Sequence, residues 1–455
     1  MESEVNNCKR KNLSVRIVSC AGILALAAAF VFWLVSERPA ASGVAAAACS
    51  LALFVFGCLR FVPGWIAFLT ERGEAPGIEE EPRHILPGIA ALAVAVELLL
   101  FGLVTLALSV RYGNGFTPRG AITFWRCLDS GHYLDIAREW YVADGDWGRV
   151  VQLVFLPGYP LTVYPLYRIL GSDLIAGLLV SAAAFPAACC VLYRLLRLDW
   201  DHRRAFRAVL MLLLLPGGFF FLAPMSESLY LLLAVSSLYC FRRKRFLFAG
   251  LLGAYCTFTR SLGLLLLAPV ILEWIRSFPN EKADRKRWIL GLLSVLLVPT
   301  GFLAYLWINK TVSGNPLQFL TYQSDHWNQR LGWFFATASY QTRYLIDSIG
   351  EGNAENVFGL WIPNLVWHFG TLALFAGTAK KLRPSYAAWL IAYFAIAIGT
   401  TWLLSGPRYL LSMPAVAVML ALTTEKRWQQ WLAAGILVPL SVLYLLAFVW
   451  RWQVW

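Results

Sequence analysis

The chain has 455 residues, of which 59% are hydrophobic and 14% are charged, against about 45–50% and about 25% in ordinary soluble domains. So few charges cannot cover a soluble protein of this size, which excludes a soluble globular fold. Lys and Arg outnumber Asp and Glu by 39 to 26, but they lie in short clusters between apolar runs, including 9–11, 203–204, 242–245 and 285–287. Such clusters are typical of solvated cytoplasmic loops. The basic balance therefore indicates contact with membrane lipids and not with nucleic acid.

The apolar runs predict an all-α, polytopic bundle of transmembrane helices that forms a single domain, residues 1–455. About eleven runs qualify as spanning helices: 13–35, 42–69, 86–110, 174–196, 205–222, 228–241, 288–308, 358–379, 386–404, 409–423 and 431–450. The first run is expected to be a retained helix and not a cleaved signal. With cluster 9–11 inside, residues 111–150 form the first large extracytoplasmic loop and 309–356 the second.

Two further apolar segments break the expected order of crossings. Residues 152–170 contain several prolines, and residues 246–275 are interrupted by Arg260. Both are predicted to be re-entrant or half-spanning hairpins, and a kinked spanning helix is the alternative for each. Because broken backbone at membrane depth occurs only inside protein or beside a wet cavity, we expect the functional site near these segments.

The first outer loop contains a stretch with helical spacing. Tyr133, Ile136 and Ala137 recur on one face of residues 130–141, and charged residues occupy the other face. This pattern predicts an amphipathic helix on the outer membrane surface. Asp129 comes directly before it, where an Asp either caps the helix or acts as a catalytic base. The spacing alone leaves both roles open.

Four more polar residues stand at unusual positions for an apolar bundle. Arg260 lies in a long apolar run and is either a phosphate-binding group or half of a buried pair with Glu97 or Glu227. Glu227 begins an outer helix, where it either favours the helix start or binds substrate hydroxyls. Arg408, at another outer helix start, is either a phosphate ligand or an interfacial residue. His132 is either an ordinary interfacial residue or a group that positions substrate.

The sequence lacks the patterns of several other functional classes. Its nine cysteines show no disulfide framework, and no CxxC or HExxH spacing predicts a metal site. No Walker A or GxGxxG signature is present, which argues against a nucleotide-driven machine. We therefore assign no metal ligand and no certain cofactor, and metal dependence stays open.

Six short stretches, taken in order, resemble one known family. They are DSGHYLDIA at 129–137, FLPGYP at 155–160, FFFLAPMSES at 219–228, TRSLG at 259–263, GNPLQF at 314–319 and, more weakly, PRY at 407–409. Together they resemble the PIG-V family, the dolichol-phosphate-mannose-dependent transferases that add the second mannose of GPI anchors, and we expect a prokaryotic relative. The chain departs from the family pattern at Leu128, Gly158 and Trp140, which bears on the acceptor more than on the reaction.

The resemblance implies an integral membrane glycosyltransferase of the GT-C type. Such an enzyme transfers a sugar, here expected to be mannose, from a polyprenyl-phosphate donor to a glycan, glycolipid or glycoprotein acceptor, by inverting single displacement on the non-cytoplasmic face. That face belongs to the plasma membrane in a prokaryote and to the endoplasmic reticulum in a eukaryote. The acid of the first outer loop is taken as catalytic in the family, which assigns this role to Asp129. The expected substrate-binding residues are His132, Tyr159, Glu227, Arg260, Gln323, His326, Trp327, Arg330 and Arg408.

Two alternatives come from other classes. A transporter or flippase for lipid or sugar-lipid would use similar broken helices, but its usual internal repeat is not found. A noncatalytic membrane scaffold would not need Asp129, His132, Glu227 and Arg260 to converge. The enzyme hypothesis requires that Asp129 share one outward-facing cavity with Arg260 or Arg408.

Overall fold

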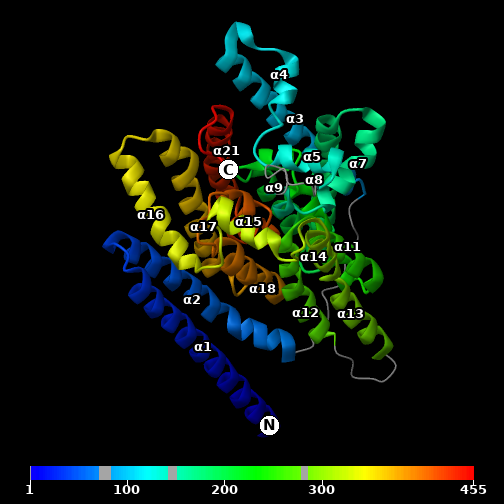
Figure 1. Ribbon diagram of the computed structural model, residues 1–455. Helices are drawn as coiled ribbons and strands as arrows, with labels where there is room; N and C mark the ends of the chain where they lie inside the picture. Colours follow the sequence, from blue (N-terminus) through cyan, green and yellow to red (C-terminus); the bar gives the residue numbers. More distant parts are fainter. Residues whose placement is uncertain (1, 71–82, 142–150, 278–284) are drawn as a thin grey trace.

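The computed structural model describes residues 2–70, 83–141, 151–277 and 285–455 (Figure 1). These residues form helices joined by turns, and the β-structure among them is one isolated antiparallel bridge between Leu331 and Thr400. The predicted all-α polytopic bundle is therefore confirmed. Of the predicted first loop, residues 142–150 lie outside the described residues.

Seven helical stretches among the described residues are long and apolar enough to cross a membrane. Several of the other predicted spans are replaced by shorter helices. The seven are α1 (Glu2–Glu37), α2 (Ala41–Thr70), α3 (Ile85–Tyr112), α8 (Asp173–Leu196), α13 with α14 (Arg285–Leu297 and Thr300–Ser313), η6 with α17 (Asn356–Trp361 and Ile362–Thr378) and α21 (Arg427–Val449).

The predicted spanning helix over residues 205–222 is wrong. Helix α9 (His202–Leu214) ends early, because Leu215 is extended and Pro216 has no N–H to continue the helix. Prolines act in the same way in the predicted span 409–423. There α19 (Gly406–Leu411) and α20 (Pro414–Thr423) form two short helices.

Helix α10 (Glu227–Arg242) replaces the predicted span 228–241 and lies at the centre of the bundle. Its 16 residues give a length of about 24 Å, which is less than the hydrocarbon thickness of about 30 Å. It packs mainly against α8 and α11 (Phe246–Thr259), and its first and last residues are both charged. The two ends of α10 therefore carry charge into the interior of the molecule.

The second predicted hairpin contains the helix interruption expected at Arg260. Helix α11 ends at Thr259, Arg260 is extended, and the chain continues through η4 (Ser261–Leu266) and α12 (Leu267–Arg276). The Phe246 and Trp274 rings both lie against Gly291 of α13. Since these two residues stand at opposite ends of the segment, the chain returns to where it started. Its depth in a membrane stays a prediction.

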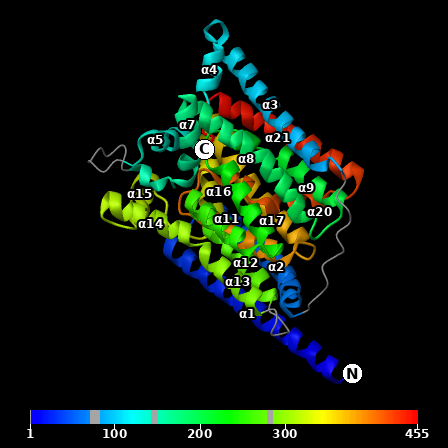
Figure 2. The ribbon, with the colours of Figure 1, turned by 90° about the vertical axis from the view of Figure 1, so that its right-hand side faces the viewer.

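The first predicted hairpin, 152–170, forms η2 (Val151–Val154) and α7 (Gly158–Leu170). Figure 2 shows α1 and α3 running in the same direction, with the loop helices α5 (Ser130–Glu139) and α15 (Gln318–Trp327) at the end where these two helices finish. The two predicted outer loops therefore lie at one end of the molecule. In α5 the residues Tyr133, Ile136 and Ala137 are buried, and its position at a membrane surface stays a prediction.

Candidate active site

Asp129 occupies the position before α5 without capping that helix. Its side chain makes no capping hydrogen bond, and its Oδ2 instead accepts one from Nη1 of Arg408. The turn that presents Asp129 is held by Ser130, whose hydroxyl donates to the carbonyls of Trp125 and Cys127. Leu128, directly before it, has a φ of 50°, a left-handed conformation that is rare and costly for a branched side chain. Asp129 therefore does not cap α5, which was the alternative to a catalytic role.

Four ionic side chains form one continuous network, which we call the site network: Asp129, Arg408, Glu227 and Arg260. Arg408 uses Nη1 for Asp129 and Nε for Oε1 of Glu227. The same oxygen of Glu227 accepts a 2.6 Å hydrogen bond from Nη1 of Arg260. The Glu227 side chain is wholly buried, whereas 32% of the Asp129 side chain is exposed. The network therefore runs from the protein interior to one accessible carboxylate.

Local chain geometry places each member at a helix end or break. Glu227 stands in the first turn of α10, and Arg408 follows Pro407 in the first turn of α19. Arg260 is extended between α11 and η4. This break is held by a close contact with α7, because a Cβ atom on Gly158 would lie 2.8 Å from Cα of Thr259. Glycine at position 158 thus allows α7 to fix the backbone beside Arg260.

Aromatic rings surround the two guanidinium groups. Arg260 lies 5.8 Å from the ring centre of Tyr230 and 5.3 Å from that of Tyr409, and Arg408 lies 6.0 Å from that of Phe220. Two buried polar atoms here, Oε2 of Glu227 and the hydroxyl of Tyr230, have no hydrogen-bond partner among the described residues. Buried polar atoms are normally paired, so these two mark the place where a polar ligand or water would fit. Nothing in the sequence distinguishes Tyr230 from the other residues of this apolar helix.

Tyr133 and Tyr159 form the wall beside the network. The hydroxyl of Tyr133 shares a 3.0 Å hydrogen bond with Ser226, the residue before Glu227. Burial raises the pKa of Tyr133 to about 12, so this hydroxyl stays protonated at neutral pH. Tyr159 packs edge-on against Tyr133, but its own hydroxyl bonds to Gly177 and Ser181. Tyr159 therefore supports the wall and has no free polar group to offer a substrate.

His132 and Trp327 come together through Phe155, a residue of the motif at 155–160 to which the sequence assigned no role. The His132 ring stacks on the ring of Phe155 with the two ring centres 4.6 Å apart, and the Trp327 ring packs edge-on against Phe155 at 6.2 Å. Tyr141 and Tyr305 hold this turn by donating to the carbonyls of Phe155 and Leu153. The first and second predicted outer loops thus meet in one aromatic cluster, which joins α5 to α15.

Three of the predicted substrate-binding residues direct their polar groups elsewhere. Gln323 donates to Gln329, the exposed Arg330 donates from Nε to Ser324, and the exposed His326 lies next to the ring of Trp327. Their roles in substrate binding stay predictions. Arg260 forms the pair with Glu227 that was the alternative to phosphate binding, although that pair is one link in the longer network. Glu97 is buried on α3, and its Oε1 has no hydrogen-bond partner in the described part of the chain.

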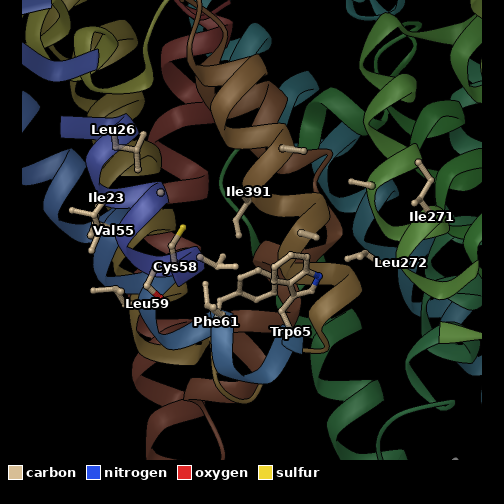
Figure 3. Close-up of a pocket in the computed structure, with 17 residues that line it drawn as sticks. Ile23, Leu26, Val55, Cys58, Leu59, Phe61, Trp65, Ile271, Leu272 and Ile391 are labelled. Carbon is tan, nitrogen blue, oxygen red and sulfur yellow. The ribbon is translucent and has the colours of Figure 1, made fainter. Parts of the chain in front are cut away.

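Two cavities among the described residues are apolar and do not contain the site network. One, of about 520 Å³, lies between α1, α2, α12 and α18 (Pro384–Tyr393), and Figure 3 shows Cys58, Trp65, Leu272 and Ile391 around it. The other, of about 530 Å³, lies between α17 and α21. Its wall includes Tyr444, which packs against Phe220 beside Arg408. Within the described ranges no group of three or more His, Cys, Asp or Glu side chains is arranged to hold a metal ion.

The fold and the site define a class: a polytopic helical membrane protein in which a buried charge network opens at a single acidic residue. Residues 127–309 match the family model described as mannosyltransferase (PIG-V). This match confirms the predicted resemblance to that family over the segment that carries Asp129, Glu227 and Arg260. Over 203 residues, the chain is 30% identical to GPI mannosyltransferase 2 of Chaetomium globosum. That alignment covers 37% of this chain and 41% of the relative, so the chain spans less than half of the curated relative that it matches.

Two solved structures are also similar to this chain. ArnT from Cupriavidus metallidurans, bound to undecaprenyl phosphate, has a TM-score of 0.44 at 15% identity, covering 80% of this chain and 76% of that one. The Archaeoglobus fulgidus oligosaccharyltransferase in its apo form also has a TM-score of 0.44 at 15% identity, covering 81% and 56%. A prokaryotic origin of this chain stays a prediction.

Proposed function

We propose that the chain is a membrane-embedded glycosyltransferase that uses a polyprenyl-phosphate sugar as donor. Mannose is the proposed sugar, and a lipid- or envelope-linked glycan, glycolipid or glycoprotein is the proposed acceptor. The reaction takes place on the non-cytoplasmic face and inverts the anomeric configuration. The observation that carries the proposal is the geometry of Asp129: a carboxylate free of helix capping, one-third exposed, and bonded to the buried Arg408, which Glu227 links to the buried Arg260.

The site network supplies the groups that this reaction needs. The acceptor hydroxyl oxygen attacks the anomeric carbon, its proton passes to Asp129, and the bond from that carbon to the phosphate oxygen breaks with its electron pair leaving on the phosphate. Arg408 and Arg260 provide the positive charge that stabilises the departing phosphate. Tyr444 connects Arg408 to the apolar cavity between α17 and α21, which supports a donor with a hydrocarbon tail.

The bond between Arg408 and Asp129 gives the donor phosphate a role in activating the base. In the structure Arg408 donates to Oδ2 of Asp129, and this hydrogen bond occupies one of the two oxygens that could accept the proton. The two acidic and two basic groups of the network balance each other, so an arriving phosphate brings excess negative charge. We propose that Arg408 then turns partly toward the phosphate, which frees Asp129 to accept the proton. Glu227, held by both arginines, keeps them in place as a positioning residue.

The test is release of lipid phosphate by purified protein supplied with a panel of polyprenyl-phosphate sugars and a mixed acceptor extract. We expect release with one donor, the mannose derivative. Asp129→Asn should lower the rate by about 10²–10⁴-fold, the usual contribution of a general base. Asp135→Asn is the matched control, because Asp135 lies on the same helix with a similar exposure of 36% but pairs only with Arg126 and Arg138. A folded Asp129→Asn variant that works at near the parent rate would exclude this mechanism.

A further inference from the structure

A third cavity, of about 270 Å³, lies away from the site network at the turn between α1 and α2. Its volume is close to the lower end of the roughly 300–1,000 Å³ range of small-molecule sites. Unlike the two larger cavities, it has polar groups on several sides. Its lining includes Glu37, Trp333 at the start of α16 (Phe334–Gly350), Tyr340, Arg343 and Thr400.

The lining combines aromatic faces with groups that bind hydroxyls. Trp333 is 43% exposed and lies beside the cavity. Glu37 is exposed and forms no ion pair within the described part of the chain. Thr400 lines the cavity, and its hydroxyl has no hydrogen-bond partner among the described residues. Rotation about its Cα–Cβ bond would turn this hydroxyl toward a ligand, which would give it a partner.

The cavity is connected to the active site along the outer surface. Trp327, in the aromatic cluster with Phe155 and His132, is followed by Asn328, whose carbonyl accepts a hydrogen bond from Thr401. An antiparallel bridge then joins Leu331 to Thr400 in the cavity wall. Residues 327–331 of the second predicted outer loop therefore link the aromatic cluster to the cavity wall through these contacts.

The chain also limits the distance between the cavity and the site network. Thr401 and Arg408 are seven residues apart, and seven extended residues span at most about 25 Å. Several bends between them shorten this distance further. A substrate of a few sugar units can bridge such a distance, with one unit at Asp129 and another in the cavity.

We propose that this cavity binds a hydroxyl-rich sugar ring of the acceptor, at a distance from the ring that reacts. The apolar face of a pyranose stacks on Trp333, while Glu37 and Thr400 bind its hydroxyls. The assignment of this sugar to the acceptor rests on the proposed function, whereas sugar binding by the cavity does not depend on catalysis. The cavity thus favours acceptors with more than one sugar unit.

The test is saturation-transfer NMR and calorimetry with full-length protein in lipid nanodiscs, using mannotriose as the probe. We expect saturable binding, weakened about three- to tenfold in Thr400→Val and in Glu37→Gln, as for the loss of one hydrogen bond each. Because the Thr400 hydroxyl has no partner in the protein, Thr400→Val should leave the thermal stability unchanged. Trp428→Ala, at an exposed Trp of α21, is the control and should bind as the parent does.

Two results would overturn the cavity assignment: no saturable binding by the parent protein, or equal affinity in the parent and both cavity variants. Asp129→Asn separates this proposal from the proposed function. It should bind mannotriose with the parent affinity while losing donor turnover. If the parent binds mannotriose through the cavity but releases no lipid phosphate from any donor, the glycosyltransferase proposal fails and the sugar site stands.

Discussion

The two ends of α10 carry two buried ionic networks of similar composition. At its start lies the site network, and at its end Arg242 joins a second group, which we call the distal network. The distal network consists of two acidic residues and two arginines from four separate parts of the chain: Asp199, Arg242, Glu273 and Arg383. Each network contains two carboxylates and two guanidinium groups. They differ in how completely those groups are paired.

In the distal network, every carboxylate oxygen has a partner. Both oxygens of Asp199 bind Arg242, and each accepts one more hydrogen bond, from Arg383 or from Tyr386. Both oxygens of Glu273 bind Arg383. In the site network, Oε2 of Glu227 has no hydrogen-bond partner in the part of the chain that the structure describes, and Asp129 is partly exposed. Complete pairing indicates a structural role. An unpaired buried oxygen beside an accessible acid instead indicates a site whose hydrogen bonds are completed by a substrate.

Breaking the distal network should give the largest effect on stability. Glu273→Gln leaves Arg242 and Arg383 with one carboxylate, that of Asp199, between them, and an uncompensated buried charge of this kind typically costs about 3–5 kcal/mol. We expect a large fall in the thermal unfolding temperature, measured in detergent, with turnover per folded molecule preserved. Glu425→Gln, which breaks the exposed pair with Lys381, should change the stability by less than about 1 kcal/mol. A loss of turnover in folded Glu273→Gln would show that the two networks are not separate in function.

Arg408→Lys tests the other network and should act mainly on catalysis. Lysine cannot bind Asp129 and Glu227 through two nitrogens of one planar group as Arg408 does. We expect turnover to fall about 10–100-fold, corresponding to about 1.4–2.7 kcal/mol. The matched control is Arg168→Lys, because Arg168 is exposed and contacts only Tyr164 on the same helix. Parent-like turnover in Arg408→Lys would mean that a single positive charge suffices.

Gly158→Ala should have an intermediate effect on both properties. The added methyl group would meet the backbone of Thr259, and overpacking of this kind costs about 1–3 kcal/mol. Because Thr259 precedes Arg260, we expect lower turnover as well as lower stability. Gly377→Ala on α17 is the control, since nothing lies within 4 Å of its added Cβ, and alanine there should stabilise the helix by up to about 1 kcal/mol. An unchanged Gly158→Ala protein would show that α7 does not position Arg260.

The two networks differ in how far their residues and contacts could be predicted from the sequence. The membrane class, the long helices and the interruption at Arg260 follow from apolar run lengths and one buried charge. The short sequence motifs identified Asp129, Glu227, Arg260 and Arg408. The pairing among these four residues, and the end of α9 before Pro216, depend on tertiary contacts and local backbone that run length does not encode.

The distal network includes a residue for which the prediction from the sequence is wrong. Cluster 242–245 was predicted to lie in a solvated loop, yet only 7% of the Arg242 side chain is exposed. Its partners Asp199, Glu273 and Arg383 are far away in the sequence and belong to no motif. A basic cluster is the usual sign of a cytoplasmic loop, so nothing local distinguishes the one arginine that turns inward. The sequence therefore predicted the residues of the site network, because they lie in motifs that resemble a known family. It missed the residues of the distal network, which is structural.

Arg330→Ala should give the smallest effect and shows how far the site network extends. Arg330 is among the expected substrate-binding residues, although it lies outside the six motifs. Its exposed guanidinium donates to Ser324, and its backbone is anchored separately to Thr401. Since an exposed hydrogen bond of this kind contributes about 1 kcal/mol or less, we expect turnover and donor KM to stay within about fivefold of the parent. Ser324→Ala removes the same hydrogen bond from the other side and should match it. If Arg330→Ala instead raised the donor KM tenfold while Ser324→Ala did not, Arg330 would be a donor-binding residue. The phosphate site would then include the second outer loop in addition to the buried arginines.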